Sequence, residues 1–244
     1  MKSSHLIAGT LVLLVIPTFG AGIAFGSADI TFADAIRVLW MHLAPTSSIR
    51  ADPIVDKIVW ELRFPRVVLA FVVGGGLSIV GVAMQTLVRN PLAEPYILGI
   101  SSGASAGASL FYLGFLPPVI SLALTLPLAA FLGGLLTMLL VYVIASRGSY
   151  IEITRLLLAG VALSAFMGAI STLATFASPE LEKMKTIMFW LLGSFAGSRW
   201  DAILLPFVVC AGCTGLMMAF ARPLDAMLLG ELRPRESTLF KLGQ

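Results

Sequence analysis

The segment Gly99–Gly103 has the residue types of a catalytic site, because it reads G-x-S-x-G. Hydrolases use this pattern to place a nucleophilic serine on a strand-to-helix turn, where an acid and a histidine activate it. The only histidines of the chain are His5 and His42, and the surrounding run is apolar enough to be a membrane helix. An intramembrane serine protease would lack the same base. We therefore interpret Ser101 and Ser102 as helix residues, and substituting either by alanine would test the hydrolase alternative.

The cysteines and the glycine run are equally weak candidates for chemistry. Cys210 and Cys213 form a C-x-x-C pair inside the apolar run Ile203–Phe220, whereas redox and metal pairs need polar, partly exposed surroundings. The run Gly74–Gly76 precedes no phosphate-binding pattern, and G-x-x-x-x-G-K-[ST] occurs nowhere in the sequence. We expect no metal and no cofactor. Any ATP that drives this protein must be hydrolysed by a separate polypeptide.

The composition indicates a membrane protein. Of 244 residues, 58% are hydrophobic and 12% are charged, and the mean hydropathy is +0.97. Soluble domains carry about 25% charged residues. The 16 basic residues are scattered rather than clustered, so the net charge of +3 reflects membrane topology and not nucleic-acid binding.

Six apolar stretches are long enough to cross a bilayer as helices, which makes the predicted fold an all-α polytopic membrane protein. The six predicted spans are Leu6–Gly26, Phe64–Val88, Tyr96–Leu113, Val119–Ala145, Ile153–Phe176 and Ile203–Phe220. The first resembles a signal peptide, but its apolar character continues through Phe25, which favours a retained helix. The segment Ala177–Asp201 contains an apolar run too short to span, so we expect a re-entrant or interfacial helix there.

The short turns between these spans predict the orientation. Arg89, Arg147 and Arg222 lie in turns that share one side of the membrane, and the turn Gly114–Pro118 on the other side has no basic residue. Because basic residues in short loops favour the cytoplasm, we predict a cytoplasmic N-terminus.

Small residues recur at four-residue spacing on three of the spans, of which the second has only a weaker version that begins with Gly74, Ser78 and Val82. On the third span they are Gly99, Gly103 and Gly107, and on the fifth they are Gly160, Ser164, Gly168 and Thr172. Such faces let helix backbones approach closely, and van der Waals contact holds helices together in lipid. We interpret them as packing faces. The alternative is that one of them, through Ser164 and Gly168, borders a translocation path.

The stretch Glu61–Ser105 is the most distinctive part of the sequence. Arg63 and Arg66 lie three residues apart on one helical face at the outer mouth of the second span. Such a pair is usual for contact with lipid headgroups, and the alternative is docking of acidic residues on a partner. Gln85 is predicted to be buried near the inner end of the same span.

The same stretch resembles the permeases of iron–siderophore, haem and vitamin B12 ABC importers, the FecCD-type or BtuC-like family. The matching patterns are R-x-P-R, then G-x-x-L-x-x-x-G-x-x-x-Q, then R-N-P-L-A-x-P-x-x-L-G-x-x-x-G-A. Later matches are Arg155–Leu163, Trp190–Phe195 with Trp200, and Leu228–Glu231. The resemblance covers residues 60–231.

This resemblance implies a transport subunit that is not itself an enzyme. It implies the first six helices of a ten-span permease in a bacterial inner membrane, working as a homo- or heterodimer. A periplasmic binding protein would dock through its glutamates on Arg63 and Arg66. Ile153 and Thr154 would belong to the cytoplasmic gate, together with a pathway past Gln85. Cytoplasmic ATPase subunits would bind the coupling segment, which comprises Leu229, Gly230 and Glu231.

Two questions stay open in the sequence. The resemblance implies a metal chelate as cargo and favours ferric siderophores, with haem and cobalamin as alternatives. Residues 232–244 depart from the family pattern, and Pro234 lies where the coupling helix should continue. We therefore expect a permease domain over residues 1–231 and an aberrant tail over 232–244. The alternative function is a truncated or frame-shifted permease fragment without transport activity.

Overall fold

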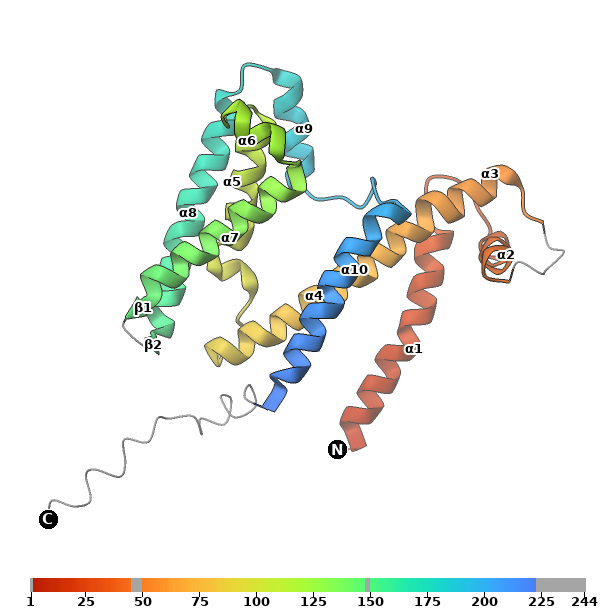
Figure 1. Ribbon diagram of the computed structural model, residues 1–244. Coiled ribbons are helices and arrows are strands. Elements are labelled where there is room, and N and C mark those ends of the chain that lie inside the picture. Colours follow the sequence, from red (N-terminus) through yellow and green to blue (C-terminus); the bar gives the residue numbers. More distant parts are fainter. Residues whose placement is uncertain (1, 45–49, 148–149, 223–244) are drawn as a thin grey trace, which may run out of the picture. The chain divides into compact units, whose positions relative to one another are not determined.

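The computed structural model describes residues 2–44, 50–147 and 150–222, which form helices and one short hairpin (Figure 1). The first elements are α1 (Lys2–Ala24), α2 (Phe32–Leu43), α3 (Pro53–Asp56), the π-helix η1 (Lys57–Arg63), α4 (Phe64–Val88) and the 3-10 helix η2 (Pro95–Leu98). The later elements are α5 (Ile100–Tyr112), α6 (Pro118–Ala123), α7 (Leu126–Ala145), β1 (Ser146–Arg147), β2 (Tyr150–Ile151), α8 (Ile153–Ala177), α9 (Leu181–Leu191) and α10 (Trp200–Ala219).

The helix content confirms the all-α prediction. Within the described residues, four helical stretches are long and apolar enough to cross a membrane, namely Pro53–Val88, Leu126–Ala145, Ile153–Ala177 and Trp200–Ala219. Residues Gly9–Ala24 of α1 form a shorter apolar helix. The helix α9 has 11 residues, or about 17 Å at 1.5 Å per residue, so it is too short to span, as expected.

Two of the six predicted spans are interrupted. In the predicted third span, η2 ends at Leu98, Gly99 has a φ of 73°, and α5 then runs for only 13 residues. Glycine is the residue that adopts such a left-handed conformation at no steric cost, and it breaks the helix here. The predicted fourth span breaks between α6 and α7, where Leu124 and Thr125 are extended. Pro127 lies in the first turn of α7, where its missing N–H costs no intrahelical bond.

The chain divides into two compact units, each with its own packing. The first unit holds the residues up to Ser78 together with Phe195–Leu216, and the second holds Ile79–Ser194 and the end of α10. The helix α4 therefore contributes its first half to one unit and its second half to the other.

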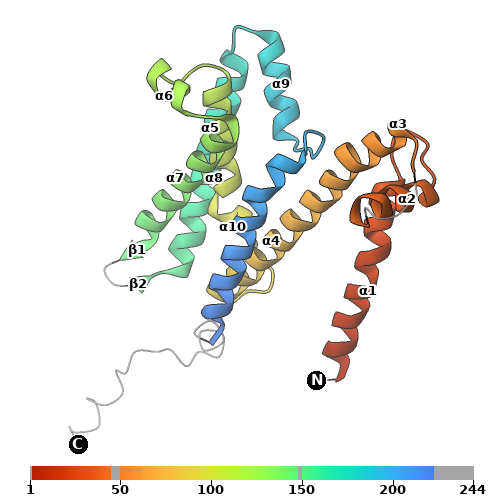
Figure 2. The same ribbon diagram turned by 45° about the vertical axis from the view of Figure 1, so that its right-hand side comes forward.

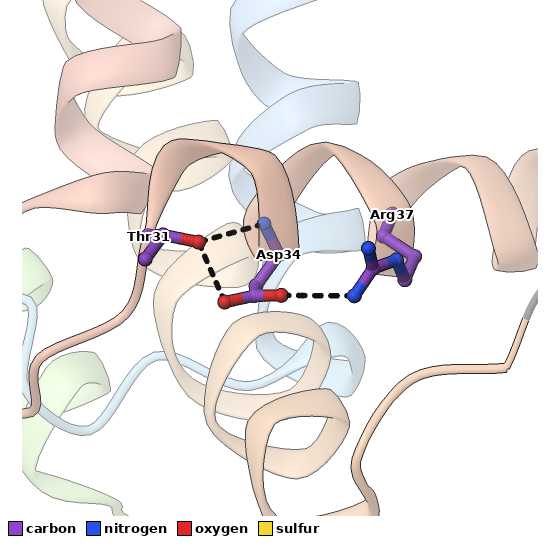
Figure 3. A network of polar contacts seen from close by, with 3 residues as sticks. All are labelled: Thr31, Asp34 and Arg37. Atoms are coloured by element: carbon purple, nitrogen blue, oxygen red, sulfur yellow. Dashed lines mark hydrogen bonds and ion pairs between the residues drawn. The ribbon is translucent and has the colours of Figure 1, made fainter.

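In the first unit, α2 is an amphipathic helix fixed by its N-cap (Figure 3). The Thr31 hydroxyl accepts a hydrogen bond from the Asp34 N–H and donates one to the Asp34 carboxylate, which in turn accepts from Arg37. The cap satisfies one of the free N–H groups of the first turn. The apolar face of α2 buries Ala35 and Val38 against Ile23 and Val59.

The π-helix η1 ends two residues before Pro65, which is fully buried. A proline inside an α-helix removes one hydrogen bond and places its ring against the carbonyl four residues earlier. In the wider turn, the Phe64 N–H bonds to Val59 O, five residues back. A π-turn is one of the ways in which a helix continues past such a break.

In the second unit, α5, α7 and α8 contact one another, and α9 contacts both α5 and α8 (Figures 1 and 2). One core cluster joins Ala108 of α5, Ala130 of α7, Ala174 of α8 and Ile187 of α9. A second cluster lies near the β1–β2 hairpin and comprises Met84, Val88, Ala93, Leu98, Val141, Ala145, Leu156 and Ala159.

Candidate functional site

A close helix contact joins α5 and α7 through glycines. A Cβ atom added to Gly103 would lie 2.6 Å from the Gly133 carbonyl oxygen and 2.7 Å from Thr137 Cβ. A Cβ atom added to Gly107 would meet the Ala129 carbonyl oxygen and would lie 3.1 Å from Gly133 Cα. Real Cβ atoms essentially never come closer than 3.0 Å to such atoms, so α5 and α7 touch backbone to backbone.

Gly133 was missed in the sequence analysis, although the signal was present. Ala129, Gly133 and Thr137 have the same four-residue spacing as the glycines of α5. This small-residue face was overlooked because all 20 residues of α7 are apolar enough to predict a membrane span, whichever side each residue faces. The two small faces meet each other, and neither would allow this approach alone.

The helix α8 joins this contact at Gly160 and Ser164. A Cβ atom at Gly160 would meet the Ile97 carbonyl oxygen of η2 and would lie 3.1 Å from Leu98 Cα. A Cβ atom at Gly99 would lie 2.9 Å from the Ser164 hydroxyl oxygen. The Ser164 hydroxyl is buried and has no hydrogen-bond partner within the described part of the chain. A Cβ atom at Gly99 would also lie 3.2 Å from Thr137 Cγ2 of α7, so Gly99 lies in close contact with both α7 and α8 and forms the break between η2 and α5.

The predicted face of α8 rotates away from its neighbours along the helix. A residue four positions on lies about 40° further round a helix with 3.6 residues per turn, so Gly168 lies about 80° from Gly160. None of the described residues lies within 4 Å of a Cβ atom at Gly168. Ser171, 11 residues after Gly160, returns to within about 20° of its direction. Close contact thus continues through Ser171 and not through Gly168.

Buried hydroxyl groups connect α5 and α8 at Ser171, where the close contact continues. The Ser109 and Ser171 hydroxyls lie 2.9 Å apart and form a hydrogen bond, and both residues are buried. The Thr175 hydroxyl donates to the Ser171 carbonyl oxygen at 2.7 Å. Interhelical bonds of this kind in membrane bundles are worth about 0.6 kcal/mol on average.

In the first unit, Arg63 occupies a different position from the one expected for a docking residue. It is only 7% exposed, and its guanidinium donates hydrogen bonds to Ile23 O at 2.9 Å, Ala24 O at 2.6 Å and Ala28 O at 2.5 Å. The Ile23 and Ala24 carbonyls lie at the end of α1, where the last carbonyl groups have no intrahelical donor, and Ala28 lies in the segment that follows α1. Arg63 therefore caps α1, and little of its side chain is exposed.

Arg66, one turn later, is exposed. Its Nη2 donates to the Ala196 carbonyl oxygen at 3.1 Å, which leaves most of its N–H donors available. Nearby, the Trp200 indole donates to Trp60 O at 2.9 Å. The His42 ring stacks on Trp60 at 4.0 Å and lies 2.7 Å from the Asp56 carboxylate.

The remaining predicted site residues lie at scattered places. Gln85, predicted to be buried, is exposed in this chain. Ile153, half-buried, packs against the core cluster near the β1–β2 hairpin, and Thr154 beside it is exposed. The predicted coupling residues Leu229, Gly230 and Glu231 lie outside the described residues, as does the predicted tail.

These features define a multi-pass membrane protein. Glycine contacts join α5, α7 and α8, and a hydrogen bond between buried hydroxyls joins α5 and α8. The chain belongs to the FecCD transport family, whose profile matches residues 11–236. This match confirms the resemblance drawn from the motifs between Glu61 and Glu231.

Individual relatives differ in the cargo that their names state. The chain is 31% identical to the molybdate import system permease protein MolB of Haemophilus influenzae, over 91% of this chain and 63% of the relative. It is 38% identical to the vitamin B12 import system permease protein BtuC of Vibrio parahaemolyticus, over 72% of this chain and 52% of the relative. The chain spans between about half and two thirds of the length of these curated relatives.

A solved structure has the same fold. It is described as an inward-facing conformation of a metal-chelate type ABC transporter. The TM-score is 0.72 at 28% sequence identity, and the match covers 92% of this chain and 65% of that chain.

Proposed function

We propose that this chain is the membrane-spanning part of a permease subunit in a binding-protein-dependent ABC importer. The observation that carries the proposal is the likeness to the inward-facing metal-chelate type transporter, at a TM-score of 0.72 over 92% of the chain. The placement of this subunit follows from the proposal. It would lie in a bacterial inner membrane, with its N-terminus in the cytoplasm.

The tight α5–α7–α8 contact suits a transport subunit, because packed helices move as one body. Gly103, Gly107 and Gly133 bring two backbones into contact, and contacts of this kind repack between discrete arrangements instead of stretching. Closure of separate ATPase subunits on ATP would move this bundle through the coupling segment around Gly230. The pathway would run between this chain and a second permease subunit, past Gln85, whose exposure in the single chain fits such a position.

We propose Arg66 as the docking residue for a periplasmic binding protein. Its guanidinium is exposed, and an exposed arginine offers a glutamate two parallel hydrogen bonds. Arg63 would act indirectly, by fixing the turn after α1. Arg66→Glu should weaken binding-protein capture in a pull-down, whereas Arg199→Glu, at another exposed arginine of the same unit, should not. Equal capture by both variants would reject the docking role.

We propose that the cargo is a metal chelate, with ferric siderophores first and haem and cobalamin as alternatives. The names of the relatives do not agree on one cargo, since they state molybdate and vitamin B12. No group of three or more His, Cys, Asp or Glu side chains among the described residues could hold a bare metal ion. A chelate recognised by the binding protein needs no such group in the permease.

The proposed function is tested by uptake in the source bacterium after deletion of the gene. Cells are offered radiolabelled ferric siderophore, haem, cobalamin and molybdate, each at limiting concentration. We expect loss of uptake of one cargo, restored by the wild-type gene and not by Gly103→Leu, which forces α5 away from α7. Gly215→Leu is the matched control, because none of the described residues lies within 4 Å of a Cβ atom there and Gly215 is not among the predicted pathway residues. Unchanged uptake of all four cargoes in the deletion strain would refute an import role for these cargoes.

A further inference from the structure

The helix α2 has a second apolar side, which stays exposed. One side of α2 packs Ala35 and Val38 against α1 and η1. At about 100° per residue, four large apolar residues outside this contact fall within a sector of about 80°. Their exposed fractions range from 49% to 69%, and they are Phe32, Ile36, Trp40 and Leu43. We call this set the apolar stripe of α2.

The charged residues of α2 lie away from the apolar stripe. Asp34 and Arg37 form an ion pair at 3.1 Å on one side of the helix (Figure 3). Arg37 lies about 100° round the helix from Ile36, and Asp34 about 160°. The helix therefore has three sides, one packed on protein, one apolar and exposed, and one charged. A helix at a membrane surface has this pattern, because lipid covers one of its sides and water another.

The position of α2 beside α1 brings the apolar stripe to the level of the bilayer. Figure 1 shows α2 nearly end-on, whereas α1 runs along the plane of the picture, so the two helices lie crosswise. A helix crosswise to an apolar helix that enters the bilayer lies along the bilayer surface.

Phe32 connects the apolar stripe to the surface of α1. A Cβ atom added to Gly20 would lie 2.8 Å from Phe32 Cε2, so the Phe32 ring lies against α1. Gly20 precedes the end of α1 at Ala24 by four residues, or about 6 Å of helix. One turn earlier, Ile16 is exposed on the same apolar helix. The stripe therefore continues the exposed apolar surface of α1.

We propose that α2 is an interfacial helix, which lies along the bilayer surface and inserts its apolar stripe between the lipids. Tryptophan is enriched at this depth, where Trp40 would lie, because its ring is apolar and its N–H is polar. Asp34 and Arg37 face water. A soluble partner would have to cover the stripe beside the lipid-covered surface of α1, whereas acyl chains cover both surfaces without a break. The inference rests on membrane insertion of the chain and not on transport.

The test locates spin labels on α2 by electron paramagnetic resonance, in the full chain reconstituted into phosphatidylcholine–phosphatidylglycerol bilayers. Cys210 and Cys213 are first replaced by alanine, and a nitroxide is then attached to Ile36→Cys, Trp40→Cys or Arg37→Cys. The collisions of each label with oxygen, which dissolves in the bilayer, are compared with its collisions with a water-soluble nickel chelate.

We expect the labels at Ile36 and Trp40 to collide mainly with oxygen, as does a reference label at Leu13, an exposed residue in the middle of α1. Arg37 is the matched control, because it is the residue next to Ile36 and lies on the charged side. Its label should collide mainly with the nickel chelate.

Two results would overturn the proposal. Collision of all three α2 labels mainly with the nickel chelate would place the stripe in water. Labels at Ile36 and Trp40 that neither reagent reaches would show that protein covers the stripe, and dipolar broadening that disappears on dilution with unlabelled chain would identify a second copy as the cover. Because no measurement involves uptake, either result leaves the proposed transport function untouched.

Discussion

The substitution Gly103→Ala adds one methyl group at a close contact between α5 and α7. Its Cβ atom would lie 2.6 Å from the Gly133 carbonyl oxygen, whereas ordinary contact begins at 3.4 Å. The obstructing oxygen belongs to the backbone of α7 and cannot rotate away. The two helices must therefore separate by about 0.8 Å, the difference between these distances.

A separation of this size has a calculable cost. A gap of 0.5–1 Å loses roughly a quarter to a half of each dispersion contact along the interface. Added methyl groups in well-packed cores cost about 1–3 kcal/mol. For a chain of this length, about 1 kcal/mol corresponds to a 2–4 °C change in Tm. We expect Gly103→Ala to lower the Tm of the detergent-solubilised protein by roughly 2–12 °C.

Gly168→Ala is the matched control for this experiment. It makes the same chemical change in a helix of the same unit, but no atom of the described part of the chain lies within 4 Å of the added methyl group. Alanine favours a helix over glycine by up to about 1 kcal/mol, so the control should melt at or slightly above the wild-type temperature. The melts are followed by circular dichroism. A Gly103→Ala protein that melts with the wild type, or a Gly168→Ala protein that melts as far below it as expected for Gly103→Ala, would refute the assignment of the packing face.

Three further substitutions test other contacts of the structure. Arg63→Gln should lower the free energy of unfolding by about 1–3 kcal/mol, because it removes charged hydrogen bonds to two carbonyls at the end of α1 and to one in the segment that follows. Chemical-denaturant unfolding beside Arg199→Gln measures this, and equal stability of the two variants would contradict the capping role. Ser164→Ala should leave the free energy of unfolding unchanged or raise it by about 1 kcal/mol, since it removes a buried hydroxyl that has no partner among the described residues. A decrease in the free energy of unfolding of more than about 1 kcal/mol would show that this hydroxyl does form a hydrogen bond. Ser171→Ala should cost about 0.6–1.7 kcal/mol through the lost bond to Ser109, and a double-mutant cycle with Ser109→Ala should show coupling between the two sites.

The sequence predicted most of the helices because their signals are local. Apolar runs of about 20 residues, proline at helix starts and basic residues in short turns are all readable without neighbours. It was wrong about continuity at two places, near Gly99 and near Thr125. In both, a run apolar enough for one span is divided by a local backbone break, and hydropathy does not register such a break.

The site residues were predictable only in part. The family motif and the small faces of α5 and α8 were found, but the Gly133 face and the burial of Arg63 were not. On a helix, each residue of a four-residue repeat points about 40° further round the axis than the one before. The sequence pattern therefore predicts Gly168 as the next contact residue, whereas in the structure the contact continues through Ser171.

By itself the sequence determined that this protein is helical, that it lies in a membrane and to which family it belongs, because composition and motif spacing are properties of the chain alone. The tertiary structure decided which glycines of α5, α7 and α8 contact the backbone of a neighbouring helix. It also decided that the Ser164 hydroxyl has no partner among the described residues, and that Arg63 caps α1 by bonding to Ile23, 40 residues earlier in the chain. The physical reason is that helix formation uses hydrogen bonds to residues four positions back, whereas burial depends on side chains that arrive from distant parts of the chain.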